Sequence, residues 1–171
     1  HNNKNSCNLI QLKHNQDYNK MFGLGYGYQS SLNESMVKHL KSKVKGILKR
    51  YKPKKNDIIV DIGSNDGTTL SFFSNKFKRI GFDPIGKKFR QNYKNMILVE
   101  NFFNSKQYSE ISNDKAKIIL SFSMFYDVEN PILFCKQIEN IIDQNKGIWI
   151  LEQSYLPSMV ENNSYDTICH E

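Results

Sequence analysis

The sequence predicts an α/β fold, a Rossmann-like doubly wound parallel sheet in one domain of 171 residues. Short apolar segments alternate with helix-like segments from residue 57 onward. The first strand of this series carries Asp61 near its end, and Gly63 and Gly67 follow at the turn into a helix. The second strand also ends in an acid, Asp83. Right-handed crossovers between parallel strands then give the strand order 3-2-1-4-5.

A long amphipathic helix is predicted over residues 31–51, ahead of the first strand. Ser31 and Glu34 match the Ser-x-x-Glu capping box that opens many helices. The helix ends at Lys52, because a residue before proline avoids helical backbone angles. The apolar residues fall at spacings of three and four and give one buried face: Met36, Val37, Leu40, Val44, Ile47, Leu48 and Tyr51.

Five strands then alternate with four helices. We expect strands at 57–62, 79–83, 96–100, 116–123 and 147–153, and helices at 66–77, 84–93, 105–112 and 129–143. A further helical turn is expected after Pro157, whereas residues 1–29 are expected to be irregular. Short apolar strands that alternate with helices are typical of a parallel sheet that is covered on both faces.

Charge and composition narrow the class of protein. The net charge is +7, and residues 38–55 hold nine Lys or Arg and no acid, which favours a solvated helix face over a nucleic-acid site. No apolar run is long enough to span a membrane, and we expect no signal peptide in the polar start. Three widely spaced cysteines, Cys7, Cys135 and Cys169, argue against a disulfide framework and favour a cytoplasmic protein.

The loop after the first strand predicts a cofactor site. Its glycines form neither the Gly-x-Gly-x-x-Gly dinucleotide fingerprint nor a Walker loop. Asp61 would repel a pyrophosphate and pair with a cation, and Asp83 is placed to accept both hydroxyls of a ribose. S-adenosylmethionine has a ribose and an amine but no phosphate. We therefore expect this cofactor on Asp61, Gly63, Ser64, Asn65, Gly67 and Asp83.

Two later strand ends complete the expected site. Phe102 or Phe103, after the third strand, could stack on the adenine, or both rings could belong to the core. Ser123 and Met124, after the fourth strand, would flank the sulfonium, with core packing as the alternative for Met124. The hydroxyl of Tyr126 could face the substrate.

Two segments carry a resemblance to a known family. They are Tyr-x-Tyr-x-Ser-Ser at 26–31 and Tyr-Asp-x-Ile-x-His-Glu at 165–171. Together with the glycine loop, they make essentially the whole chain resemble the class I methyltransferases that C-methylate nucleotide-linked 4-keto-deoxyhexoses. The resemblance implies a small-molecule substrate, S-adenosylmethionine as cofactor, and a protein built from a zinc domain, a methyltransferase core and a substrate domain.

The resemblance also implies domain boundaries. Residues 1–29 correspond to a remnant or linker after a zinc domain, and residues 30–171 to the methyltransferase core, cut before its final antiparallel strands and the C-terminal domain. Cys7 resembles the last zinc cysteine, but Lys4 stands where its Cys-x-x-Cys partner would be. A tetrahedral zinc site needs four ligands, so we expect no metal.

Catalytic roles follow from the same resemblance. A base must remove a proton beside the ketone, and hydroxyls must stabilise the enolate. The candidate residues are His170, Glu171, Tyr126, Tyr28 and Tyr26. In the family a second histidine follows the His-Glu pair and is the expected base, so we expect this chain to bind cofactor but to methylate poorly. The departures at Tyr126 and Cys169, where the family often has His and Tyr, bear on the choice of sugar.

Two alternatives remain open. The chain could methylate nucleic acid with the basic segment 38–55, although the only Phe, Tyr or Trp among those charges is Tyr51, which belongs to the predicted buried face. It could also be a non-catalytic fragment that binds S-adenosylmethionine. Turnover of a keto-sugar nucleotide would separate the enzyme from the fragment.

Overall fold

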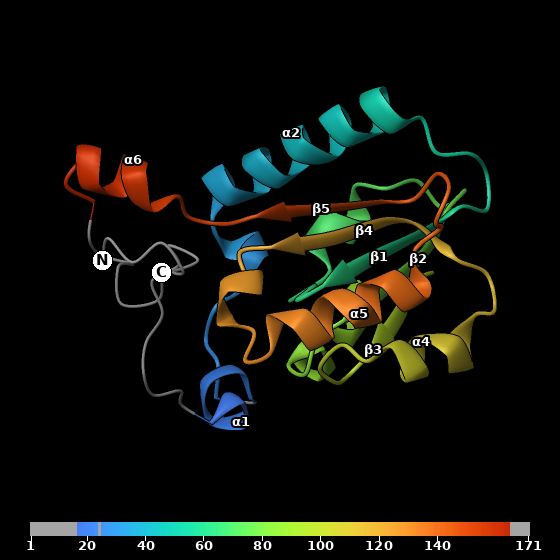
Figure 1. Cartoon of the computed structure of the whole chain (residues 1–171), viewed down its shortest axis with the longest axis horizontal. Helices are drawn as coiled ribbons and strands as arrows, with labels where there is room; N and C mark the ends of the chain where they lie inside the picture. The colour runs from blue at the N-terminus through green and yellow to red at the C-terminus, as the bar shows by residue number, and fades with distance from the viewer. Residues whose placement is uncertain (1–16, 24, 165–171) are drawn as a thin grey trace, which may run out of the picture.

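The computed structural model describes residues 17–23 and 25–164. Its five strands are all parallel and form one sheet in the order β3-β2-β1-β4-β5, which confirms the predicted fold and strand order. Figure 1 shows the strands side by side, with helices above and below them. The strands are β1 (Ile58–Ile62), β2 (Lys78–Phe82), β3 (Ile97–Val99), β4 (Ala116–Phe122) and β5 (Ile148–Glu152).

Helices cover both faces of this sheet. One face packs on α2 (Glu34–Tyr51), α3 (Thr68–Ser71) and the 3₁₀ helix η2 (Gly86–Asn92), around residues such as Val44, Ile59 and Leu120. The other face packs on α4 (Ser105–Ile111) and α5 (Pro131–Ile141), around residues such as Val60 and Ile138. The remaining elements are α1 (Tyr18–Phe22), η1 (Ser30–Leu32), η3 (Phe125–Asp127) and α6 (Leu156–Glu161).

The start of α2 differs from the prediction. Asn33 caps this helix, with its side chain accepting hydrogen bonds from the backbone N–H groups of Ser35 and Met36. Ser31 cannot serve as the cap, because it lies in η1 and its own N–H donates to Asp66. The predicted capping box was therefore wrong by two residues, whereas the buried face of the helix was correct.

Two helices after β1 and β2 are shorter or tighter than expected. The predicted helix 66–77 is shortened to α3 (Thr68–Ser71). The guanidinium of Arg79 donates hydrogen bonds to the carbonyl oxygens of Leu70 and Phe73, within the stretch predicted to be helical. The predicted helix 84–93 is the 3₁₀ helix η2, which is interrupted by the non-helical backbone of Phe89. The short helix α1 was missed by the prediction, and Asp17 caps it.

The strand β5 lies at the edge of the sheet, as the sequence analysis expected. Its side chains are half-buried, with Leu151 exposed, and its only pairing partner among residues 17–23 and 25–164 is β4. The helix α2 runs beside β5 in Figure 1. Over the same described ranges, no helix is both long and apolar enough to cross a membrane.

Gly81, in the middle of β2, offers a stability test. A Cβ atom there would lie 2.6 Å from Ser64 Oγ and 2.9 Å from Tyr93 Cε1. We expect Gly81→Ala to lower the free energy of unfolding by about 1–3 kcal/mol, since overpacking strains a well-filled site. In α2, by contrast, a Cβ on Gly46 meets open space, so Gly46→Ala should stabilise by about 0.5–1 kcal/mol. Urea unfolding of both variants checks this, and equal shifts would contradict it.

Candidate active site

The loop between β1 and α3 turns sharply at three residues with positive φ. Gly63 (φ 75°), Asn65 (φ 50°) and Gly67 (φ 80°) adopt the left-handed region, which glycine and asparagine tolerate best. The N–H of Gly63 donates to the carbonyl oxygen of Phe82 at 2.9 Å, and the N–H of Gly67 donates to that of Ser64 at 2.9 Å. The loop is thus fixed against the end of β2.

Tyr93 holds this loop in place through its hydroxyl group and its ring, a role that the sequence did not reveal. Its hydroxyl donates to the carbonyl oxygen of Asn65 and lies 2.9 Å from Ser64 Oγ. Its ring also lies 3.2 Å from the position that a Cβ on Gly67 would take. Burial raises the pKa of Tyr93, so the phenol keeps its proton and remains a donor.

A cavity of about 680 Å³ opens at the carboxyl edge of the sheet, above this loop. This is the edge where doubly wound folds bind their ligands, and the volume suits a small molecule. The cavity brings together nearly all of the predicted residues that the structure describes: Tyr26, Tyr28, Asp61, Gly63, Ser64, Asn65, Asp83, Phe102, Phe103, Ser123, Met124 and Tyr126. Gly67 shapes the loop but does not line the cavity.

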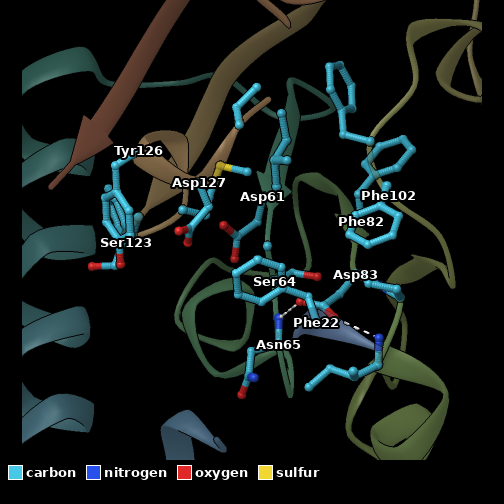
Figure 2. Close-up of a pocket in the computed structure, with 18 of the residues that line it drawn as sticks. Phe22, Asp61, Ser64, Asn65, Phe82, Asp83, Phe102, Ser123, Tyr126 and Asp127 are labelled. Carbon is cyan, nitrogen blue, oxygen red and sulfur yellow. Dashed lines mark hydrogen bonds between the residues drawn. The ribbon is translucent and has the colours of Figure 1, made fainter. Parts of the chain in front are cut away.

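Two aspartates stand at the floor of the cavity (Figure 2). Asp61 is 2% exposed, and its Oδ2 has no hydrogen-bond partner among the described residues. Burial, with Asp83 nearby, raises the pKa of Asp61 well above its usual value. Asp83 accepts hydrogen bonds from the backbone N–H groups of Asn65 (2.7 Å) and Ile85 (2.9 Å). Burial raises its pKa, and these two hydrogen bonds oppose the rise.

Aromatic rings form the wall near the end of β3. Phe103 packs edge-on against Phe82, with ring centroids 5.2 Å apart, and also contacts Phe134. Phe102 is 37% exposed beside it (Figure 2). Phe103 is therefore held within an aromatic cluster, whereas Phe102 keeps an accessible surface at the rim of the cavity. Of the two, Phe102 is the better placed to stack on a ligand.

The wall after β4 contains Ser123 and Met124. Ser123 has a positive φ of 51°, and its N–H donates to the carbonyl oxygen of Glu152 at 2.7 Å. The Met124 side chain packs over the loop, with Cγ 3.2 Å from where a Cβ on Gly63 would lie. Met124 thus contacts both the core and the cavity, so neither of its two predicted roles is excluded.

Tyrosines from the N-terminal segment close the cavity on another side. The rings of Tyr26 and Tyr28 lie 6.4 Å apart, and Phe22 contacts Tyr26 at 5.6 Å. Burial raises the pKa of Tyr26, and the carboxylates of Asp127 and Asp83 add to the rise. The Tyr26 hydroxyl is therefore a hydrogen-bond donor at neutral pH.

Glu152, at the end of β5, is a cavity residue that the sequence analysis missed. Its carboxylate is bound by two side chains of α2: His39 Nε2 lies 2.8 Å from Oε1, and Lys43 Nζ lies 2.6 Å from Oε2. Burial acts to raise the pKa of Glu152, but the ion pairs with Lys43 and His39 outweigh it and lower the pKa. No local motif could have linked His39 to a residue 113 positions away in sequence.

Some predicted site residues lie outside the described part of the chain. These are His170 and Glu171, and the possible zinc residue Cys7, so their roles stay predictions. Within residues 17–23 and 25–164, no group of three or more His, Cys, Asp or Glu side chains is arranged to hold a metal ion.

Comparison with known proteins finds methyltransferases that are similar to this chain. No family model matches the chain. Over 169 residues the chain is 25% identical to the C-methyltransferase NovU of Streptomyces niveus, an alignment that covers 96% of this chain and 40% of that protein. The chain thus spans less than half the length of this curated relative.

Solved structures share the fold at lower identity. The plantazolicin methyltransferase BpumL, in complex with a triazolic desmethylPZN analog and SAH, superposes with a TM-score of 0.57 at 19% identity, covering 83% of this chain and 57% of that chain. The precorrin-6y C5,15-methyltransferase of Geobacter metallireducens GS-15 gives 0.52 at 12% identity, covering 83% and 74%. At these identities the likeness establishes a Rossmann-like methyltransferase fold.

Proposed function

We propose that this chain, which has the fold of class I methyltransferases, binds S-adenosylmethionine and takes part in methyl transfer to a small molecule. The observation that carries the proposal is Asp61. Its buried carboxylate lines the cavity, and its Oδ2 has no partner among the described residues. A buried carboxylate in this position calls for a cation or a donor. S-adenosylmethionine carries both an ammonium and a sulfonium group.

The residues present fit this cofactor. Asp83 can accept ribose hydroxyls, because each of its oxygens uses only one lone pair on the backbone. Gly63 lines the cavity and has no side chain of its own, so a ligand can approach its backbone on the side that the Met124 side chain leaves open. Phe102 offers a ring surface for the adenine, and Ser64 and Ser123 offer hydroxyl groups. When bound, the cofactor supplies an electrophilic methyl group.

The charge of the cavity bears on the acceptor. The charged residues of the described part that line it are all acidic: Asp61, Asp83, Asp127, Glu129 and Glu152. Such a lining disfavours a phosphate group inside the cavity. It therefore gives no support to a nucleic-acid substrate, and an uncharged ring fits better. We propose a keto-deoxysugar acceptor whose ring enters the cavity while any nucleotide phosphates stay outside.

The acceptor chemistry rests on the family resemblance. A base takes the proton from the carbon beside the ketone, and that carbon then attacks the methyl group. His170 and Glu171 are the predicted groups for handling this proton. Tyr26, whose raised pKa keeps it protonated, can donate a hydrogen bond to the enolate oxygen, as can Tyr28 and Tyr126.

The few cysteines favour a reducing compartment, so we propose that this activity takes place in the cytoplasm.

Calorimetric titration tests the cofactor half of the proposal. We expect S-adenosylhomocysteine to bind the chain and ATP, which shares the adenosine but carries phosphates, to bind far more weakly. Equal affinity for the two, or no binding of S-adenosylhomocysteine, would contradict the proposal.

Proton exchange tests the acceptor half. A nucleotide-linked 4-keto-6-deoxyhexose should exchange its α-proton with D₂O in the presence of the chain and should accept a labelled methyl group from S-adenosylmethionine, at the low rate expected from the sequence. Binding of cofactor with neither exchange nor transfer would support the alternative of a non-catalytic cofactor-binding fragment.

A further inference from the structure

The segment 25–32, which we call the strap, lies across the cofactor loop. Three of its residues, Tyr26, Tyr28 and Ser30, line the cavity, so the strap forms one of its walls. The strap buries little of its own: Tyr28 is 44% exposed, Leu32 is 78% exposed, and η1 contains no buried residue. Apolar packing therefore contributes little to holding the strap in place.

Polar contacts from two loop residues hold the strap instead. The side-chain amide of Asn65 bonds it twice: Oδ1 accepts from the N–H of Ser30 and Nδ2 donates to the carbonyl oxygen of Tyr28, both at 3.0 Å. Asp66 Oδ2 accepts from the N–H of Ser31 at 2.9 Å. Asn65 and Asp66 are 8% and 1% exposed, so these bonds are sheltered from water.

The same two residues are tied to the cofactor site. The N–H of Asn65 donates to the carboxylate of Asp83, and its carbonyl oxygen accepts from Tyr93. The other carboxylate oxygen of Asp66 binds the hydroxyl and the N–H of Thr68, at the start of α3. Its hydrogen bonds to Thr68 and Ser31 outweigh burial and lower the pKa of Asp66, which stays ionised as an acceptor. The strap and the ribose-binding carboxylate thus share one rigid connection.

We propose that Asn65 and Asp66 are positioning residues that latch the strap over the cofactor loop, so that opening of the strap governs access to the cavity. The inference rests on the proposed function in taking S-adenosylmethionine or its product as the ligand. A ligand that contacts the strap binds the closed state better than the open state. Its apparent affinity is therefore proportional to the fraction of molecules in which the strap is closed. Sequence reasoning gave Asn65 a direct cofactor contact; the geometry gives its side chain to the strap.

The test uses two variants that remove the latch from opposite sides. Asn65→Gly deletes the side chain and keeps the positive φ without strain. Ser30→Pro deletes the N–H that donates to Asn65, together with the Ser30 hydroxyl, and Ser30→Ala controls for the loss of the hydroxyl. Proline suits the first position of η1 after the extended Gln29 (φ −138°, ψ 120°). Asn95→Gly is the matched control, since Asn95 also has a positive φ (58°) but is exposed at the amino edge of β3.

Hydrogen exchange of the strap amides in ligand-free protein reads the latch directly. We expect residues 25–32 to exchange about tenfold faster in Ser30→Pro, which loses one hydrogen bond to Asn65, and up to about a hundredfold faster in Asn65→Gly, which loses two, because each bond is worth about a factor of ten. Their dissociation constants for S-adenosylhomocysteine should rise as the closed fraction falls, by up to about tenfold, and their dissociation rates should rise with the opening of the strap. Saturating ligand should restore protection. Asn95→Gly should match wild type in both measurements.

Each result that differs from these expectations contradicts a specific part of the proposal. Unchanged exchange of the strap in both variants would overturn the latch. Faster exchange with unchanged affinity and unchanged association and dissociation rates would overturn its control of access. A loss of affinity in Asn65→Gly but not in Ser30→Pro would return Asn65 to direct ligand contact. If wild type binds no S-adenosylhomocysteine, the proposed function fails, while the exchange arm still decides whether the latch exists.

Discussion

Replacing Asp83 with alanine is expected to weaken binding of S-adenosylhomocysteine by about 1.5–3 kcal/mol, which is roughly a 10- to 150-fold rise in the dissociation constant. Hydrogen bonds to a charged acceptor are worth about this much, and a ribose would make two of them. The change also frees the N–H of Asn65, which donates to Asp83 Oδ2 at 2.7 Å, so the loop that carries the ligand loses an anchor. Titration calorimetry measures the affinity.

Asp57→Ala is the matched control. Asp57 lies at the opposite edge of the same sheet, just before β1, and its Oδ2 accepts from the N–H of Lys54. It should bind S-adenosylhomocysteine as wild type does. Equal affinity of Asp83→Ala and Asp57→Ala would remove Asp83 from the ligand site.

Asp61→Asn is expected to raise the stability of the ligand-free protein and to weaken its binding of S-adenosylmethionine. The substitution removes a buried carboxylate whose Oδ2 has no partner among the described residues, so it should stabilise the ligand-free protein at neutral pH by about 1 kcal/mol. It should also weaken binding of S-adenosylmethionine by about 2–5 kcal/mol, the usual cost of truncating one member of a buried charge pair. Urea unfolding and calorimetry measure the two effects.

The stability gain expected for Asp61→Asn depends on pH. Burial raises the pKa of Asp61 in the folded state above the usual 3.8. The folded protein therefore holds the proton more tightly than the unfolded chain, and stability falls as the pH rises from 3.8 through the folded value. Asp61→Asn should lack this fall, so its advantage should vanish in acid. A variant that is less stable than wild type at neutral pH, or that binds the cofactor equally well, would contradict the assignment.

Much of the fold was predictable because its signals are local. Each strand is a short apolar run, and β1 is buried along its whole length, as expected for a central parallel strand. The glycines at 63 and 67 and the two strand-end aspartates could be identified because a turn of this shape needs specific residues at fixed spacing. These features alone place the ligand edge of the sheet.

What the sequence could not reveal depends on contacts between distant residues. Arg79, from the next strand, binds the carbonyl oxygen of Leu70 in α3 and that of Phe73 just after the helix, where the sequence predicted further helical turns. Tyr93 reaches back 28 residues to support the loop at Asn65, and nothing in its own neighbourhood marks it. The strap contacts of Asn65 and Asp66 span 35 residues or more. Such partners are selected by three-dimensional packing, which a single sequence does not display.

The ion pairs of Glu152 also bear on how the molecule reaches its folded state. His39 and Glu152 are 113 residues apart, so the wall between α2 and β5 closes only after nearly the whole described chain has been assembled. Contacts of such long separation form late, because the loop entropy must be overcome first. Until then the apolar stripe of α2, with Leu40, Val44 and Ile47, has no complete surface to pack on. During synthesis part of this stripe therefore stays uncovered until Ile148 and Ile150 of β5 pack against the same cluster.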